Sequence, residues 1–344
     1  MSTVGTLRDL GDRIDDPVSL ARAVDRLLAA RTEPPELFGL GEPTHGFEAF
    51  PLLRNELLGH LVERGYRSIA LETDFFAAAM VEDYVSGAAT DIDSVLETGF
   101  SHRFGAVPGN RELLQWLRAH NAGREPRERT RFYGFDAPVE YAGGPSPRHA
   151  LTWVLDYLPP ALRPPSAREI LASAGDDAEW TNEAAMYDPA ASIGNSHRAR
   201  ALRVLADDLA SVLRRAAPML RPADASAYDL AVAHARTALG LSRYHAGMAD
   251  PVGDRMSNLL SLRAEMMADN LLAIRARERH RGPTLAFAHN VHLQRTRSDM
   301  TIGPDTTNWC GAGALVAEPL RDRYVFVAAD AAHDSAPGTL QHML

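Results

Sequence analysis

The chain contains no lysine and only a single cysteine. All 36 basic residues among its 344 residues are arginine. A Walker-type phosphate loop, a pyridoxal-phosphate enzyme and a Schiff-base mechanism each need a lysine amine, so these classes are excluded. Cys310 alone cannot form an internal disulfide or a cysteine-based metal cluster, and we interpret it as a core or loop residue. The absence of a Gly-x-Ser-x-Gly motif argues against a serine hydrolase with a nucleophile elbow.

Long apolar runs and an excess of positive charge are absent as well. No window is apolar enough to span a bilayer, and the N-terminal segment lacks the apolar core of a signal peptide. We therefore expect no membrane interaction and a cytoplasmic location. The formal net charge of -9 and the pI near 5.8 leave no basic face for nucleic acid. What the chain does have is a 45% hydrophobic composition, which is enough to bury a sizeable core.

Short apolar strands alternate with helical patterns in the first part of the chain, and strands return near its end. Between the first two strands, leucines recur at helical spacing, so the two strands should be parallel and joined by a crossover helix. Asn110 is expected to cap a further helix. The five strands are expected at residues 37–40, 68–71, 132–135, 284–287 and 324–327.

The middle of the chain has a different pattern. Long helices are expected at residues 196–217, 223–245 and 254–279, without a convincing strand. We predict an α/β fold whose mostly parallel central sheet is flanked by helices, with a helical lobe covering the active-site cleft. The predicted division is an α/β core over residues 1–146, the helical lobe over 147–280 and the second part of the core over 281–344.

Ionisable residues follow the predicted strands. Ligands of open parallel α/β sheets bind outside the carboxyl ends of the strands, where residues distant in sequence converge. Each residue alone could be a cap or a turn residue. Two strand ends that each present a histidine beside a further polar group favour one shared active site. In chain order these residues are Glu42 and His45, Glu72, Asp136, His289 and His292, and Asp330.

Two chemistries fit this set of residues. A histidine with a pKa near neutrality can remove a proton from water while a glutamate fixes its tautomer, and a second histidine or an arginine can stabilise the oxyanion. Alternatively, imidazoles and carboxylates can bind a divalent metal that activates water. Gly41 and Pro43 place the Glu-x-x-His sequence in a loop, unlike a helical di-iron pair. The His289-x-x-His292 pair lacks the glutamate of a zincin motif. Both chemistries stay open.

Five sequence blocks carry a resemblance to a known family. They are GEPTHG at residues 41–46, IALETD at 69–74, YGFD at 133–136, RAEMMADN at 263–270 and AFAHNVH at 286–292. In this order and at these approximate separations they resemble the erythromycin esterase family, from about residue 35 to residue 295. The resemblance implies a hydrolase with an α/β core, a helical lobe and a cleft between them. It also implies opening of a macrolide lactone by water, without a required metal or cofactor.

The resemblance implies roles for individual residues. His45 would be the general base, Glu42 and Glu72 would orient it or the water, and His289 and His292 would line the opposite wall. Arg54, in the helix after the loop, would be an electrostatic partner, although a solvent-facing arginine with a buried stem is an alternative. Arg54, Asp136 and Arg263 are predicted to contact the substrate.

The sequence also departs from the family pattern. Ala264 stands where the family usually has aspartate, and Phe287 stands where it commonly has tryptophan. We therefore predict a hydrolase of an ester or macrolactone, acting on a polyketide or another secondary metabolite, in antibiotic resistance or in biosynthesis. The alternatives are a metal-dependent hydrolase, a tailoring enzyme performing elimination or cyclisation with the same residues, and a non-enzymatic haem-binding protein. The expected partner is a small molecule.

Overall fold

The computed structural model describes residues 14–140, 143–302 and 305–330, and the chain forms two units. As far as they are described, unit 1 consists of Met1–Phe135, Leu271–Ser298 and Gly311–Leu344, and unit 2 of Asp136–Asn270 and Asp299–Cys310. The domain boundaries predicted after residues 146 and 280 stay predictions, as does the covering of a cleft by a helical lobe. No described helix is both long enough and apolar enough to cross a membrane.

One sheet carries all five predicted strands, in the order β3-β2-β4-β1-β7. β4 pairs in parallel with β1 on one side and with β2 on the other, and β7 pairs in parallel with β1. The predicted α/β fold with a parallel central sheet is confirmed. The strands are β1 (Leu37–Glu42), β2 (Ser68–Asp74), β3 (Arg131–Asp136), β4 (Thr284–His289) and β7 (Tyr324–Ala328).

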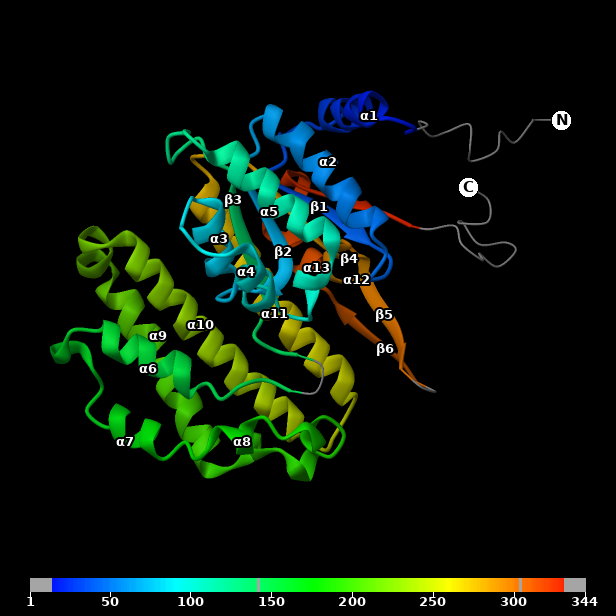
Figure 1. Cartoon of the computed structure of the whole chain (residues 1–344). Helices are drawn as coiled ribbons and strands as arrows, with labels where there is room; N and C mark the ends of the chain where they lie inside the picture. Colours follow the sequence, from blue (N-terminus) through cyan, green and yellow to red (C-terminus); the bar gives the residue numbers. More distant parts are fainter. Residues whose placement is uncertain (1–13, 141–142, 303–304, 331–344) are drawn as a thin grey trace. The chain divides into compact units, whose positions relative to one another are not determined.

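Helices bury leucine faces against this sheet. Leu58 of α2 and Leu113 of α5 are fully buried, and they belong to the same apolar cluster as Ile69 and Leu285 of the strands. Figure 1 shows α2 and α5 side by side. The helices of unit 1 are α1 (Pro17–Ala29), α2 (Ala49–Glu63), α3 (Ala78–Val85), α4 (Ile92–Thr98), the 3-10 turn η2 (Phe104–Ala106), α5 (Pro108–Asn121), α12 (Asn290–Leu293), α13 (Ala312–Leu320) and the 3-10 turn η7 (Arg321–Arg323).

Unit 2 is mainly helical, and its three longest helices match the three long helices predicted from the sequence. Alanines and leucines on one face of α9 and α10 form a buried cluster with α6. A two-stranded sheet of β5 (Arg297–Ile302) and β6 (Asp305–Cys310) was not predicted. The helices are α6 (Arg148–Tyr157), α7 (Ala167–Ala172), α8 (Asp177–Trp180), α9 (His197–Ala223), α10 (Ala225–Met248) and α11 (Arg255–Glu278), which continues into unit 1; the 3-10 turns are η3 (Pro160–Leu162), η4 (Glu183–Met186), η5 (Pro189–Ala191) and η6 (Ile193–Asn195).

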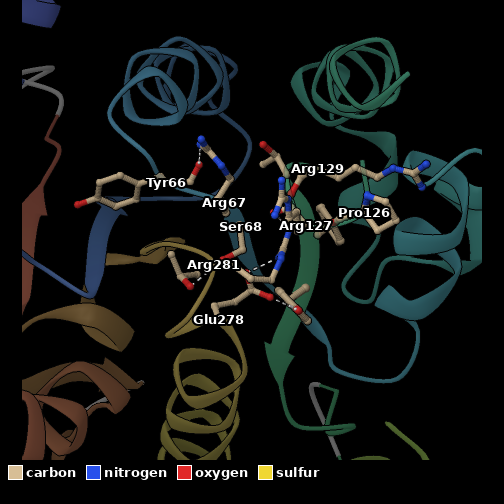
Figure 2. Close-up of polar contacts among 12 residues, drawn as sticks. Tyr66, Arg67, Ser68, Pro126, Arg127, Arg129, Glu278 and Arg281 are labelled. Atoms are coloured by element: carbon tan, nitrogen blue, oxygen red, sulfur yellow. Dashed lines mark hydrogen bonds and ion pairs between the residues drawn. The ribbon is translucent and has the colours of Figure 1, made fainter. Parts of the chain in front are cut away.

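A buried ionic network lies near the amino ends of β3 and β4. Glu278 is 1% exposed, and it accepts hydrogen bonds from the Tyr133 hydroxyl at 2.6 Å and from Arg281 Nη1 at 2.5 Å. The second Arg281 nitrogen, Nη2, donates to the carbonyl of Arg129 (Figure 2). Burial, followed by the charge of Glu278, raises the pKa of the Tyr133 hydroxyl. The network therefore ties the turn before β4 to the segment before β3.

Removing the arginine from this network should destabilise the fold. Arg281→Met leaves the Glu278 carboxylate buried without its counter-charge, and we expect a loss of about 3 kcal/mol in the free energy of unfolding. Urea unfolding followed by circular dichroism measures the loss. Arg279→Met is the matched control, because Arg279 is exposed and its Nε donates to the neighbouring His280. Equal unfolding midpoints for the two variants would contradict the importance of the network.

Candidate active site

The loop after β1 places a histidine directly over a buried glutamate. Glu42 ends β1 and is 6% exposed. The loop turns through Gly46, whose φ of +91° lies in the left-handed region that glycine adopts without strain. His45 Nδ1 lies 2.8 Å from Glu42 Oε1, and the His45 side chain is 39% exposed. A carboxylate on Nδ1 fixes the proton there, so Nε2 is the basic nitrogen of the neutral ring.

A second glutamate holds the end of β4. One oxygen of Glu72 accepts the backbone N–H of His289 at 2.9 Å, and the other lies 3.2 Å from His292 Nε2. Glu42 stands opposite His289 in the register of β1 and β4. Glu72 and His292 are 5% and 7% exposed, so this pair is buried. The structure thus brings Glu42, His45, Glu72, His289 and His292 together at the carboxyl ends of three adjacent strands.

His289 lies between the two glutamate–histidine pairs. Its ring centroid is 5.4 Å from that of His45 and 6.4 Å from that of His292. Its Nδ1 accepts the backbone N–H of Val291 at 3.2 Å, so the neutral ring carries its proton on Nε2. Burial lowers the pKa of His289, and the charges of His45 and His292 lower it further. The opposing influences are the charge of Glu72 and a hydrogen bond to the Pro43 carbonyl.

Arg54 is a buried cation in α2. It is 1% exposed, so the alternative of a solvent-facing arginine is wrong. Its guanidinium donates to Asn110 Oδ1 at 2.8 Å, to Asn55 Oδ1 at 2.7 and 3.1 Å, and to the Gly109 carbonyl at 3.1 Å. Its central carbon lies 5.0 Å from the centroid of the Phe287 ring. Burial lowers the pKa of Arg54 to about 9, against the opposing charges of Glu42 and Glu112, so the group is cationic at neutral pH.

A small pocket in unit 1 joins Glu42, His45, Arg54 and Glu72, whereas His289 and His292 are not among its lining residues. Its volume is about 30 Å³, which admits a water-sized group but no lactone ring. Apolar side chains make most of its wall, and ionisable groups meet in it from three elements. The lining residues are Glu42, His45, Gly46, Pro51, Arg54, Leu71, Glu72, Phe100, Phe104, Val107, Asn110, Phe287 and Ala288.

Asn110 does not have the capping role that the sequence predicted for it. It was predicted to cap a helix, but α5 begins two residues earlier at Pro108, and Asn110 is 4% exposed within the first turn. Its side chain accepts from Arg54 and donates from Nδ2 to the Phe104 carbonyl at 2.8 Å. An asparagine near a helix start usually signals a cap. No feature of the local sequence indicates that a helix 56 positions earlier supplies its partner.

Asp136 and Arg263, which were predicted to contact the substrate, bind each other in unit 2. Arg263 Nε donates to Asp136 Oδ1 at 3.0 Å, and Arg263 Nη2 to Asp136 Oδ2 at 2.6 Å. Asp136, the last residue of β3, is fully buried, and the Arg263 side chain is 19% exposed. This bidentate pair orients both groups. Their predicted contact with a substrate stays a prediction.

Comparison with known proteins identifies the family. Residues 61–337 match the sequence model of the family described as Erythromycin esterase. The chain belongs to the erythromycin esterase family. The matched range contains Glu72, His289 and His292 and begins after the loop that carries Glu42 and His45. A comparison with curated proteins finds no significant match.

Solved structures share the fold at low sequence identity. A Bacillus cereus protein is 18% identical with a TM-score of 0.67, covering 91% of this chain and 69% of its own. A succinoglycan biosynthesis protein is 18% identical with a TM-score of 0.62, covering 92% and 71%. A mutant of the erythromycin esterase EreC in its open conformation is 21% identical with a TM-score of 0.63, covering 88% and 72%. These likenesses concern the fold alone.

Membership of the erythromycin esterase family supports an ester-hydrolase-like function on a small molecule. Glu42 and Glu72 are each paired with a histidine, an arrangement suited to proton transfer. Within residues 14–140, 143–302 and 305–330, no three or more His, Cys, Asp or Glu side chains are arranged to hold a metal ion.

The titration of His289 can be checked directly. We expect its ring to titrate below the ordinary histidine pKa of 6.5, because burial disfavours the cation. Glu72→Gln should lower the midpoint further, because it removes a negative charge while keeping an oxygen for the His289 N–H. Because the pKa of His289 is lowered in the folded state, the fold loses stability as the pH falls below 6.5.

The measurement is a pH titration of the His289 ring signals by NMR. Glu56→Gln is the control, because Glu56 is an exposed glutamate on α2 and its loss should leave the midpoint unchanged. A His289 midpoint at or above 6.5 in the wild-type protein would show that burial does not dominate at this ring.

Proposed function

We propose that the chain hydrolyses an ester or lactone with water that His45 activates. The observation that carries this proposal is the 2.8 Å contact between His45 Nδ1 and Glu42 Oε1, on a ring whose side chain is 39% exposed. Glu42 stabilises the imidazolium that forms when Nε2 accepts a proton from water. The resulting hydroxide attacks the ester carbonyl carbon, and the tetrahedral intermediate collapses as the imidazolium returns the proton to the leaving alkoxide. The products are a carboxylic acid and an alcohol.

The second pair and the buried arginine have separate parts in this proposal. Arg54 is a preoriented cation in a largely apolar pocket, where it would stabilise negative charge that develops on the carbonyl oxygen. Glu72 holds the His289 backbone and the His292 ring, so it would keep the β4 end in place. Because the pKa of His289 is lowered, this ring stays neutral to a lower pH than an ordinary histidine. It would therefore not repel the positive charge that forms on His45.

The substrate class follows from the size of the pocket. A volume of about 30 Å³ accommodates the reacting atoms only, so the rest of the substrate would bind outside it. Phe47, in the same loop as His45, is 53% exposed, so it would be available for an apolar contact with that part of the substrate. We therefore propose a macrolactone or another apolar, polyketide-like ester as the substrate.

Loss of the general base should abolish most of the turnover. His45→Asn keeps a polar side chain of similar length but has no basic nitrogen, and we expect the rate to fall by about a hundred- to ten-thousand-fold. A panel of macrolactones and aryl esters, read by the mass gain of one water, identifies a substrate and then measures the rate. His280→Asn is the control, since His280 is an exposed histidine of unit 1. A His45→Asn enzyme that kept more than about a tenth of the wild-type rate would refute this role.

Chelation separates proton transfer from metal-activated water. If His45 activates water directly, prolonged dialysis against a chelator should leave the rate unchanged, and elemental analysis should find well under one metal per chain. A zinc hydrolase dialysed in parallel shows that the chelator works. Activity that is lost on dialysis and restored by zinc or manganese would instead establish the metal-dependent alternative.

A further inference from the structure

Asn110 connects two walls of the pocket through the oxygen and the nitrogen of its side-chain amide. Its Oδ1 accepts from Arg54 Nη1 at 2.8 Å, and its Nδ2 donates to the carbonyl of Phe104 at 2.8 Å. All three residues line the pocket. A buried amide with both its oxygen and its nitrogen paired has a fixed orientation, so a displacement at one partner is transmitted to the other.

The Phe104 side of this connection reaches His45. The centroid of the Phe104 ring lies 4.9 Å from that of the His45 ring. Phe104 follows His102 and Arg103, whose φ angles of 55° and 60° are left-handed, a conformation that costs energy in residues other than glycine. Such a turn persists only where its surroundings hold it. The hydrogen bond from Asn110 to the Phe104 carbonyl is one of the contacts that hold it.

The Arg54 side of this connection preserves a positive charge. The four hydrogen bonds of the guanidinium go to amide oxygens of Asn55, Gly109 and Asn110, all of which are neutral. A carboxylate at position 110 would orient the guanidinium equally well but would cancel its charge. A neutral amide orients the cation and leaves its field available to the pocket.

We infer that Asn110 is a positioning residue, which fixes both the Arg54 guanidinium and the turn at Phe104. The cation and the His45 ring are thereby held so that they act on the same reacting group. This inference rests on the proposed hydrolysis for its effect on turnover. One part of the inference depends on no substrate: Asn110 fixes the position of the His45 ring through its hydrogen bond to Phe104.

The test compares Asn110→Leu and Asn110→Asp with Asn121→Leu. Asn121 is a matched control, because it is a buried asparagine of the same helix whose side chain also bridges two backbone segments, at Val85 and Thr130. Asn110→Leu removes both hydrogen bonds at similar volume. Asn110→Asp keeps an acceptor for Arg54, loses the donor to Phe104 and adds a charge.

Turnover gives the first readout. We expect Asn110→Leu and Asn110→Asp to lower kcat by about ten- to a thousand-fold, with KM changed by less than about threefold, because the lost interaction acts on charge that develops during reaction. Asn121→Leu should lower the unfolding midpoint without this loss of kcat. If Asn110→Asp kept the wild-type kcat, a neutral partner for Arg54 would be unnecessary, and the inference would be overturned.

The second readout needs no substrate, so it separates failure of this inference from failure of the proposed function. Because the centroids of the Phe104 and His45 rings lie 4.9 Å apart, the ring current of Phe104 should shift the NMR signals of His45. In Asn110→Leu these signals should move toward those of a solvent-exposed histidine, and in Asn121→Leu they should stay in place. Unchanged His45 signals in Asn110→Leu would overturn the positioning role, even if no ester in the panel were hydrolysed.

Discussion

The pairing of β4 with β1 on one side and β2 on the other is the constraint on which the candidate site depends. It places Glu42 opposite His289 and brings Glu72 within hydrogen-bond distance of the His289 backbone. The strands pair in parallel, so their carboxyl ends share one edge. Any slip of β4 by one residue would turn His289 to the other face of the sheet. Glu72 accepts the His289 N–H, so it stabilises the register that the site requires.

The sequence was informative wherever local patterns decide structure. The five strands and the three long helices follow from apolar periodicity, and Glu42, Glu72 and His289 were located by their positions directly after or at the ends of strands. The position of β4 between the first two strands could not be predicted, because it depends on pairing between residues more than 200 positions apart. The β5–β6 pair was missed, because its polar, threonine-rich segments lack an apolar run.

Side-chain partners were the least predictable part of the site. Arg54 sits at a helical position that fits either a buried or a solvent-facing residue, and its burial follows from where α5 packs. Asn110 has the residue type and place of a helix cap, and only the approach of α2 gives it another role. In both cases the deciding contact is long-range, so composition and spacing alone carry no signal of it. The family resemblance pointed to Arg54 but not to Asn110.

Buried charge is handled in two different ways at the two ends of the same strands. Near the amino ends, Glu278 binds Arg281 directly and accepts from Tyr133, so opposite charges cancel and the arrangement serves the fold. At the carboxyl ends, Arg54 is equally buried, yet its hydrogen bonds go to neutral amides. The charges of Glu42 and Glu112 favour the cation, yet burial outweighs them and lowers the pKa of Arg54 to about 9. Neutral hydrogen-bond partners orient the guanidinium without forming an ion pair, as the proposed action of Arg54 on a reacting group in the pocket requires.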